Sequence, residues 1–526
     1  MNRNRKLAIF ITCLMVLSLV VAQAGLDRAK LGETRSVTLP SYAILDEEAH
    51  PVIASSGKVG FISSVTGGSL IALNLSTGRV ISSVVVGETA GLISMAETGD
   101  RRLIAIPAAN NPAGGHPATI SIIDATSTRV PEMRSLIVLP PAAQITHNTR
   151  ALLTKDGKFC LIATSFGETS LLAFDIETGQ LVSEIALAGR PSEIAFYQSD
   201  GHRRLAVASA ASNTLSLIDV DWQGHLAFKA SFSPDGARFD EANNPVFAPD
   251  GRSVYIAALQ GDLLFQIDAW TGEELSRVEV VCPQRITVAK SDKGLDMIGV
   301  MRIRRPTNNK PGGVSVIANR GGRLSPVSEF NPPEAIEFSR ANNVIFDESA
   351  SIAFVGSATG MLFAFDVESG ELESFQAIGS EVRRVELNER GRNVVVVRSA
   401  PGGDEVIIVG FDLAESDDTE PAAPRISSLK PSVVEQGRLK NLRLIVSGEN
   451  FSEGASLLVN GTETAAELVQ QGRGLEARLP RSLFDQPGTI SVQVKSMSGA
   501  TSEPSPLSVV RPSAPVIEKI KPDELP

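Results

Sequence analysis

The chain has 526 residues, 43% of them hydrophobic and 21% charged, a composition typical of a folded protein that is too long for one ordinary core. Its formal net charge is −11 and it contains no long basic run, which excludes nucleic acid as a partner. The length therefore favours several domains or a large body built from repeats.

The first residues have the three parts of a secretory leader. MNRNRK is basic, residues 7–21 (LAIFITCLMVLSLVV) are apolar, and Ala22-Gln23-Ala24 is a small-residue cleavage signal. We expect residues 1–24 to be a signal peptide cleaved after Ala24, and the mature protein to be secreted, periplasmic or held at the cell surface. An uncleaved anchor is the alternative, but this apolar stretch is short for a span of ~20 residues. No later segment is apolar enough to span a membrane, so none is expected after cleavage.

A phrase in the sequence then recurs at wide intervals. SLLAFDIETGQLVSEIALAG (170–189) matches the stretches that begin at Ser69, Leu263 and Met361. In each, an apolar run ends at an Asp or Asn, a turn containing Gly follows, and a second apolar run leaves the turn. This pattern predicts a hairpin whose Asp or Asn caps the turn and whose Gly adopts a left-handed conformation, and we favour capping over metal ligation. Such anchors recur every 44 to 51 residues, at Asn74, Asp124, Asp175, Asp219, Asp268, Asn319, Asp366 and Asp412.

Two further strand-like segments precede most anchors, such as DGKFCLIAT (156–164) and SEIAFYQ (192–198). Each period therefore holds four short strands joined by turns, with no convincing helical periodicity. Four antiparallel strands every ~40–50 residues are typical of a β-propeller blade. The predicted fold class is all-β, with a β-propeller over residues 35–413. The repeat count gives eight blades, and seven remain possible if one interval is irregular.

A circular array of sheets must close, and the two ends of the repeat region predict how. The last repeat stops at Asp412-Leu413 with no outer strand after it, while RSVTLP (35–40) is a strand without a partner before the first repeat. We expect this N-terminal strand to complete the last blade and to remove its exposed edge.

The repeats resemble a known family. The phrasing of residues 165–196 (SFGETSLLAFDIETGQLVSEIALAGRPSEIAF) resembles the bacterial YVTN-type β-propeller repeats, which are similar to lactonase-like propellers. The resemblance covers residues 35–413. It implies a propeller fold and makes a lactonase-like hydrolase one functional alternative.

The pattern changes after the repeats. Residues 414–424 are acidic and rich in Pro and Ala, and we expect a linker there. Residues 425–510 hold short strands at even spacing, which predicts a small β-sandwich. Residues 511–526 repeat the start of this module, and we expect a poorly packed tail that resembles the first strand of a second sandwich.

One stretch of the sandwich carries a second resemblance. SGENF…ASLLVNG (447–461) is similar to the IPT/TIG immunoglobulin-like domains, in which a Gly-x-Asn-Phe turn precedes a strand that ends in Gly. The resemblance implies an immunoglobulin-like fold and structural roles for Gly448, Asn450, Phe451 and Gly461.

Polar residues recur in the loops that lead into the predicted inner strands. In a propeller these loops gather on one face, so side chains in register would ring the mouth of the central channel. Asn and Arg there would form a locally positive funnel for an anionic or polyhydroxylated ligand. The alternative is that the Asn residues cap turns and the Arg residues solvate the rim. The candidate ligand-binding residues are Asn148, Arg150, Asn243, Asn244, Asn342, Asn343, Arg383 and Arg384, with Arg190, Arg238, Arg302, Arg304, Arg305 and Arg340 nearby in the sequence.

Catalytic signals are weak. The sequence has no Cys-x-x-Cys-His haem motif, no Gly-x-Ser-x-Gly elbow and no metal-ligand spacing among its histidines, so neither a cofactor nor a metal is expected. A lactonase-like enzyme would need an acid and a base, for which His147 or His116 with Glu241 or Arg150 is the available grouping. We favour a role in loop solvation for each of these residues.

The preferred hypothesis is an exported, monomeric binding or scaffold module and not an enzyme. Its partner would be a protein or an anionic or polyhydroxylated ligand outside the cytoplasm. Cys160 and Cys282 lie far apart in strand-like contexts, so we expect them to be buried small hydrophobes and not a disulfide.

Overall fold

The computed structural model describes most of residues 29–511, and it divides the chain into two compact units, Met1–Ala414 and Glu415–Pro526. The signal peptide, most of the linker and most of the tail predicted above lie outside the described residues. In the part of the chain that is described, no helix is long and apolar enough to cross a membrane. The gaps between residues 29 and 511 are 46–48, 50, 66, 88–89, 100, 110–116, 147–148, 165, 168–169, 200, 305–311, 334, 401–403, 414–423, 438–440, 452–454, 470–473 and 497–500.

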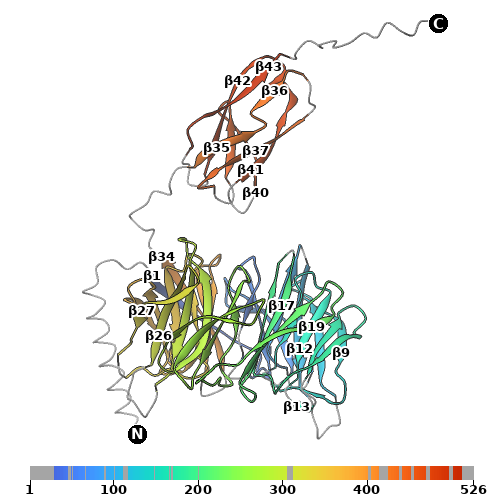
Figure 1. Ribbon diagram of the computed structural model, residues 1–526, viewed down its shortest axis with the longest axis vertical. Coiled ribbons are helices and arrows are strands. Elements are labelled where there is room, and N and C mark those ends of the chain that lie inside the picture. The colour runs from blue at the N-terminus through green and yellow to red at the C-terminus, as the bar shows by residue number, and fades with distance from the viewer. Residues whose placement is uncertain are drawn as a thin grey trace, which may run out of the picture. The chain divides into compact units, whose positions relative to one another are not determined.

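Four-stranded antiparallel sheets make up the first unit (Figure 1), and the described residues form eight of them. The first strands are β2 (Val52–Ile53), β6 (Ser94–Thr98), β11 (Ala151–Leu153), β16 (Glu193–Gln198), β20 (Val246–Phe247), β24 (Pro283–Lys290), β28 (Val344–Phe346) and β32 (Val382–Asn388). The second strands are β3 (Val59–Ser64), β7 (Arg101–Ala108), β12 (Phe159–Ala163), β17 (Arg203–Ser209), β21 (Ser253–Ala258), β25 (Asp296–Arg302), β29 (Ile352–Gly356) and β33 (Asn393–Arg398). The third strands are β4 (Ser69–Asn74), β8 (Thr119–Asp124), β14 (Ser170–Asp175), β18 (Thr214–Val220), β22 (Leu263–Asp268), β26 (Gly313–Arg320), β30 (Met361–Asp366) and β34 (Glu405–Leu413). The fourth strands are β5 (Arg79–Val85), β9 (Glu132–Val138), β15 (Leu181–Ala186), β19 (Leu226–Phe232), β23 (Glu274–Glu279), β27 (Arg323–Phe330), β31 (Leu372–Ala377) and β1 (Ala29–Val37).

The first strand of each sheet lies innermost. First strands contact the first strands of neighbouring sheets, for example β28 with β32 and β32 with β2. The second and third strands are almost wholly buried, whereas fourth strands such as β5 and β23 alternate exposed and half-buried residues. One additional small sheet pairs β10 (Ala143–Gln144) with β13 (Phe166–Gly167).

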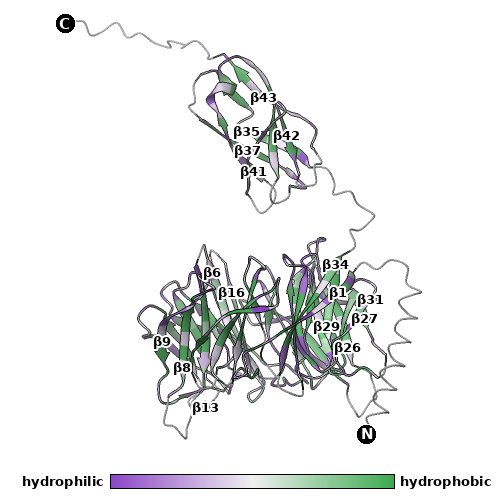
Figure 2. Ribbon diagram, turned by 180° about the vertical axis from the view of Figure 1, so that it is seen from behind, coloured by the Kyte–Doolittle hydropathy of each residue, from purple (hydrophilic) through white to green (hydrophobic). Residues whose placement is uncertain are grey.

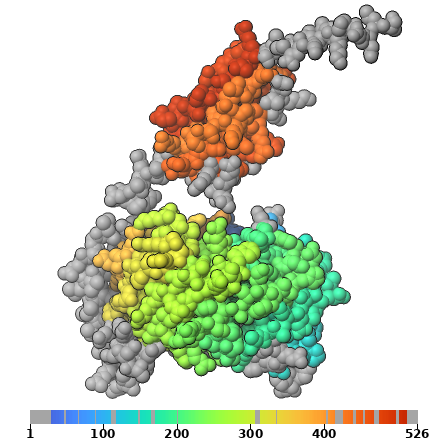
Figure 3. Space-filling view, in the orientation of Figure 1, coloured from blue at the N-terminus to red at the C-terminus, as the bar shows by residue number. Residues whose placement is uncertain are grey.

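Apolar side chains join each sheet to the next. In β33, Val394 and Val396 pack against β29 and β30 of the preceding sheet, while Val395 and Val397 point to the opposite face and pack against β4 of the first sheet. This alternation follows from the two-residue period of a strand. Together with these two, six further clusters connect successive sheets, so apolar contacts run from each sheet to the next and from the last sheet back to the first. Figure 2 shows the hydrophobic residues concentrated along the strands, and in Figure 3 the colour changes gradually across the first unit because neighbouring sheets are also neighbours in the sequence.

The structure places both cysteines in the interior, and Cys160 belongs to one of these clusters. Cys160 and Cys282 are both buried and form no disulfide, as the sequence predicts. Burial raises the pKa of the Cys160 thiol to about 12, so this group is an inert hydrophobe at physiological pH.

The N-terminal strand pairs with the last repeat, as predicted from the sequence. β1 runs antiparallel to β34, with partners from Ala29↔Leu413 to Val37↔Val406 and one irregularity between Leu31 and Thr34. Ala29, Leu31 and Val37 are buried in the clusters on either side of the last sheet. The strand begins earlier than the predicted segment 35–40, because Ala29 and Leu31 also contribute buried side chains.

The recurring phrase forms the hairpin between the third and fourth strands. Asp175 Oδ1 accepts a hydrogen bond from the backbone N–H of Thr178 at 2.7 Å. A backbone N–H two or three residues later likewise donates to the side chains of Asn74, Asp124, Asp268, Asn319 and Asp366. The following glycine has a positive φ in each of the four quoted phrases, for example +69° at Gly179. Both structural roles predicted for the phrase are therefore confirmed at these positions. Asp219 differs, because its carboxylate pairs with Arg204.

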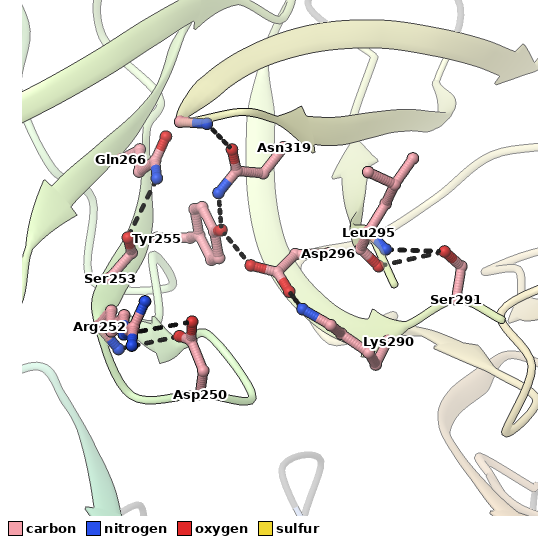
Figure 4. A network of polar contacts seen from close by, with 11 residues as sticks. Asp250, Arg252, Ser253, Tyr255, Gln266, Lys290, Ser291, Leu295, Asp296 and Asn319 are labelled. Carbon is pink, nitrogen blue, oxygen red and sulfur yellow. Dashed lines mark hydrogen bonds and ion pairs between the residues drawn. The ribbon is translucent and has the colours of Figure 1, made fainter. Parts of the chain in front are cut away.

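A partly buried polar network links the sheet of β21 to the sheet of β25 (Figure 4). The Tyr255 hydroxyl donates to Asp296 Oδ2 at 2.7 Å and accepts from Asn319 Nδ2 at 2.8 Å. Lys290 Nζ donates to the other Asp296 oxygen at 2.9 Å. Burial and the neighbouring carboxylate raise the pKa of Tyr255 well above its usual range, so the hydroxyl remains a donor.

We expect Tyr255→Phe to lower the free energy of unfolding of the first unit by about 1–3 kcal/mol, because Asp296 and Asn319 each lose a buried partner. The matched control is Tyr42→Phe, since the hydroxyl of Tyr42 bonds Ser83 at the exposed surface and its loss changes stability by about 0.5 kcal/mol or less. Urea unfolding of both variants measures the difference. Equal effects would show that the network adds nothing to stability.

The second unit is a two-sheet β-sandwich. One sheet has the order β35-β37-β41-β40 and the other β36-β43-β42-β38-β39. Its elements are β35 (Arg425–Lys430), β36 (Val433–Glu435), β37 (Asn441–Glu449), β38 (Ser456–Val459), β39 (Thr462–Thr464), β40 (Glu467–Val469), β41 (Gly474–Pro480), the 3-10 turn η2 (Arg481–Phe484), β42 (Gly488–Lys495) and β43 (Ser505–Val510). A single apolar cluster from both sheets, including Leu444, Leu457 and Val492, fills the space between them.

The four sandwich residues singled out in the sequence lie at turns or in packed positions. A side chain at Gly448 would collide with the Arg425 carbonyl, only 2.0 Å from an added Cβ. Asn450 and Gly461 adopt positive φ values of 62° and 81°, and Phe451 is buried in the sandwich core. These positions therefore shape turns and packing.

Candidate functional site

A cavity of about 610 Å³ lies among the loops that lead into the first strands of the first unit. We call these segments, together with the loops between second and third strands, the mouth loops. Together with residues of the adjoining strands, they supply the cavity walls from seven of the sheets, those of β6, β11, β16, β20, β24, β28 and β32. The charged residues on the wall are Arg150, Arg190, Arg285, Arg340 and Arg383 and Glu193, Glu241 and Glu381.

Three mouth loops share one turn, which sets their register. The backbone N–H of Asp240 donates to Asn243 Oδ1 at 2.7 Å, and that of Ser339 donates to Asn342 Oδ1 at 2.6 Å. In the loop before β11 the N–H of Thr146 donates to the Thr149 hydroxyl at 3.0 Å. Thr149, Asn243 and Asn342 are therefore equivalent positions in the three loops.

The first amide of each Asn pair is buried by backbone contacts. Asn243 is fully buried, and its Nδ2 donates to the carbonyl of Gln284 at 3.1 Å while its Oδ1 also accepts from the N–H of Leu259 at 3.3 Å. Asn342 is 1% exposed and donates to the Val382 carbonyl. Neither side chain lines the cavity.

The second amide of each pair joins two sheets. Asn244 donates to the carbonyl of Ile286 and accepts from its N–H, both at 2.9 Å. Asn343 makes the same two bonds with Val385, again at 2.9 Å. The four amides thus behave as the turn-capping alternative describes, and they hold the mouth loops against the next inner strand instead of facing the cavity.

Arg150 occupies the position of Asn244 and Asn343 in the loop before β11. Its side chain lines the cavity, and its backbone forms a parallel bridge with Leu92 of the neighbouring sheet. A guanidinium cannot reproduce the two-bond amide contact with one backbone residue, because it has donors and no acceptor. The change from Asn to Arg at this position therefore supplies the cavity with a cation.

Ion pairs connect sheets that are not neighbours, through the mouth loops and the starts of the first strands. Arg285 Nη1 lies 3.1 Å from Glu193 Oε1, which joins β24 to β16 with the sheet of β20 between them. Arg340 Nη1 lies 3.4 Å from Asp240 Oδ1, and Arg285 Nε donates to the Arg340 carbonyl at 3.3 Å. Arg383 bonds Asp404 at 2.6 Å. These contacts show that the mouth loops converge on a common centre.

A second charged group lies deeper along β32. Arg384 is 7% exposed, and Glu386, two residues later, lies on the same face of the strand. Burial raises the pKa of Glu386 to about 7, although Arg150 and Arg384 both act to lower it. Arg150 and Arg384, which come from different sheets, therefore act on one carboxyl group.

Of the remaining candidate residues, some line the cavity and others lie outside the part of the chain that the structure describes. Glu241 lines the cavity, whereas His116, His147 and Asn148 lie outside the described residues. The lactonase-like acid and base pair consequently has only Glu241 and Arg150 within the described part of the chain. Over the same part, no group of three or more His, Cys, Asp and Glu side chains is arranged to hold a metal ion.

Comparison with known proteins bears on the first unit. No protein-family model and no curated protein matches the chain. The solved dihydro-heme d1 dehydrogenase NirN, in complex with DHE, is similar with a TM-score of 0.52 at 16% identity, covering 73% of this chain and 76% of that one. The C-terminal WD40 domain of Sif2 has a TM-score of 0.50 at 9% identity, covering 70% and 98%, and BamB from Moraxella catarrhalis has 0.49 at 12%, covering 72% and 99%.

The first unit has a β-propeller fold. At these identities the likeness concerns the fold alone. In the propeller the first strands surround the channel, and the mouth loops with their arginines lie at one end of it.

Several residues of the site were not singled out from the sequence. Glu193, Arg285 and Glu386 lie on first strands of the propeller, and Glu381 directly precedes one. The sequence does contain a signal for these residues. A charged residue in a short inner strand departs from the apolar pattern of β20 and β28. Charge in these segments indicates the channel side of a blade.

Proposed function

We propose that the protein is an exported binding module whose propeller mouth takes a small multivalent anion or an oxygen-rich ligand. The observation that carries the proposal is the cavity of about 610 Å³ with five arginines and three glutamates on its wall. This volume lies within the range of small-molecule sites, and rigid scaffolds with variable loops are common places for them.

The charged residues on the cavity wall favour an anionic ligand over a cationic one. The chain as a whole has a net charge of −11, yet arginines outnumber acids on the cavity wall. Arg285, Arg340 and Arg383 are held in place by Glu193, Asp240 and Asp404. Guanidinium groups fixed in this way lose little side-chain entropy when they bind a carboxylate or phosphate.

The number of blades, the two family resemblances and export are part of the same proposal. Eight blades, the last completed by β1, would agree with the sheets and apolar clusters described above. The resemblance to YVTN-type repeats and to IPT/TIG domains would make the second unit an immunoglobulin-like module carried beside the propeller. Export would follow from cleavage after Ala24.

We expect a multivalent anion such as pyrophosphate to raise the melting temperature of the mature chain by a few degrees, since binding at a hundredfold excess over Kd stabilises by about 2.7 kcal/mol. Arg150→Ala combined with Arg384→Ala should abolish this increment. The control is Arg101→Ala with Arg277→Ala, which removes the same charge from exposed ion pairs elsewhere on the propeller. An increment that survives the first pair of substitutions would contradict the proposed site.

A further inference from the structure

The loops before β20 and β28 place an acid and a base at equivalent points of the cavity wall. Both loops contain the turn in which a backbone N–H donates to the side chain of Asn243 or Asn342, three residues later. The residue that follows the donor is Glu241 in one loop and Arg340 in the other, and both line the cavity. The shared turn therefore brings side chains of opposite charge to one wall.

Two of the three glutamates on the wall are already paired with arginines. Glu193 Oε1 lies 3.1 Å from Arg285 Nη1, and Glu381 Oε2 lies 4.0 Å from Arg383 Nε. Glu241 differs, because it is exposed and forms no hydrogen bond or ion pair with any residue that the structure describes. Its carboxylate is therefore open to a ligand in the cavity.

Positive and negative groups are equal in number once the partners behind the wall are included. The wall itself has five arginines and three glutamates. Asp240 and Asp404 do not line the cavity, but each pairs with one of these arginines, at 3.4 Å and 2.6 Å. The charges are separated in space and do not cancel locally. Electrostatic complementarity at such a site is greatest for a ligand that carries both signs of charge.

We propose that the ligand carries an ammonium group beside its carboxylates, and that Glu241 binds the ammonium group while Arg340 binds a carboxylate. The inference rests on the proposed function, since it names the class of ligand for the same cavity. A small zwitterion with more than one carboxylate is still a net anion. Asp240 connects the two contacts, because it precedes Glu241 in the chain and its Oδ1 lies 3.4 Å from Arg340 Nη1. No covalent bond changes on binding.

L-Glutamate and glutarate are the probes, because they share one dicarboxylate skeleton and differ only in the ammonium group. Titration calorimetry of the mature chain gives Kd for each. We expect glutamate to bind about tenfold more tightly, which is the effect of one additional hydrogen bond between charged groups. Arginines alone would favour glutarate, whose net negative charge is larger, so a preference for glutamate reports a carboxylate of the protein.

Glu241→Gln should remove this preference, by weakening glutamate about tenfold while glutarate changes by about twofold or less. Arg340→Gln should weaken both probes to a similar extent, because it removes the partner of a carboxylate that they share. Both residues are exposed, so neither substitution disturbs the core. The matched control is Glu177→Gln. The Glu177 side chain is 80% exposed in the hairpin between β14 and β15, at the other end of its sheet from the mouth loops, and its loss should leave both Kd values unchanged.

The outcomes separate this inference from the proposed function. Equal Kd values for the two probes in the wild-type chain, with both weakened by Arg340→Gln, would overturn the zwitterionic ligand and leave the anion site intact. A preference for glutamate that persists in Glu241→Gln would overturn the role of Glu241. If neither probe bound while pyrophosphate still raised the melting temperature, the inference alone would fail. If pyrophosphate also had no effect, the site itself would be overturned.

Discussion

We expect deletion of residues 25–37 to lower the melting temperature of the propeller by about 10 °C. Deletion of residues 425–526 is expected to change it by no more than about 2 °C. The first deletion removes β1, which pairs with β34 from Val37↔Val406 to Ala29↔Leu413. It also exposes apolar surface in both neighbouring clusters. Lost burial and lost hydrogen bonds together amount to about 5 kcal/mol or more, a large part of the stability of an ordinary domain.

The second deletion removes a unit with its own core. The apolar cluster of the sandwich contains residues of both its sheets and none of the propeller. Tryptophan fluorescence reports the propeller alone, because Trp222 and Trp270, the two tryptophans of the chain, both lie in the first unit, stacked on Arg203 and Arg204. Equal shifts for the two truncated chains, or none for the first, would show that β1 does not stabilise the propeller.

The repeat architecture could be predicted because its determinants are local. An Asp that accepts from a backbone N–H three residues later and a Gly with positive φ are signals within one hairpin, as Asp175, Thr178 and Gly179 show. Even the pairing of β1 with β34 was predictable, since each end of the repeat region lacked a strand that the other could supply. The short first strands were harder, because β2 and β20 have only two residues each.

The site could be predicted only in part, because the direction of a side chain depends on contacts far away in the chain. The sequence placed Asn244 and Arg150 at similar points in similar loops. One turns to the backbone of Ile286, 42 residues away, while the other faces the cavity. Likewise, the pairing of Arg285 with Glu193 joins residues 92 apart across the channel, and no spacing along the chain encodes it.

The second prediction with a large effect concerns the buried amide of Asn243. We expect Asn243→Ala to lower the free energy of unfolding by about 2–4 kcal/mol, because the N–H of Asp240 and the carbonyl of Gln284 lose their partner in a fully buried place. The control is Asn74→Ala, which removes an exposed hairpin cap and is expected to cost about 1 kcal/mol or less. Urea unfolding followed by tryptophan fluorescence gives both values.

Asn243→Ala also distinguishes a structural amide from a ligand-binding one. The side chain does not line the cavity, so the rise in melting temperature produced by a multivalent anion should persist in this variant at its lower starting temperature. Arg150→Ala with Arg384→Ala should show the reverse pattern and lose that rise. If Asn243→Ala left stability unchanged and abolished the rise, the amide would bind the ligand directly, and the bonds that it makes to the backbone would have to be exchanged for ligand contacts upon binding.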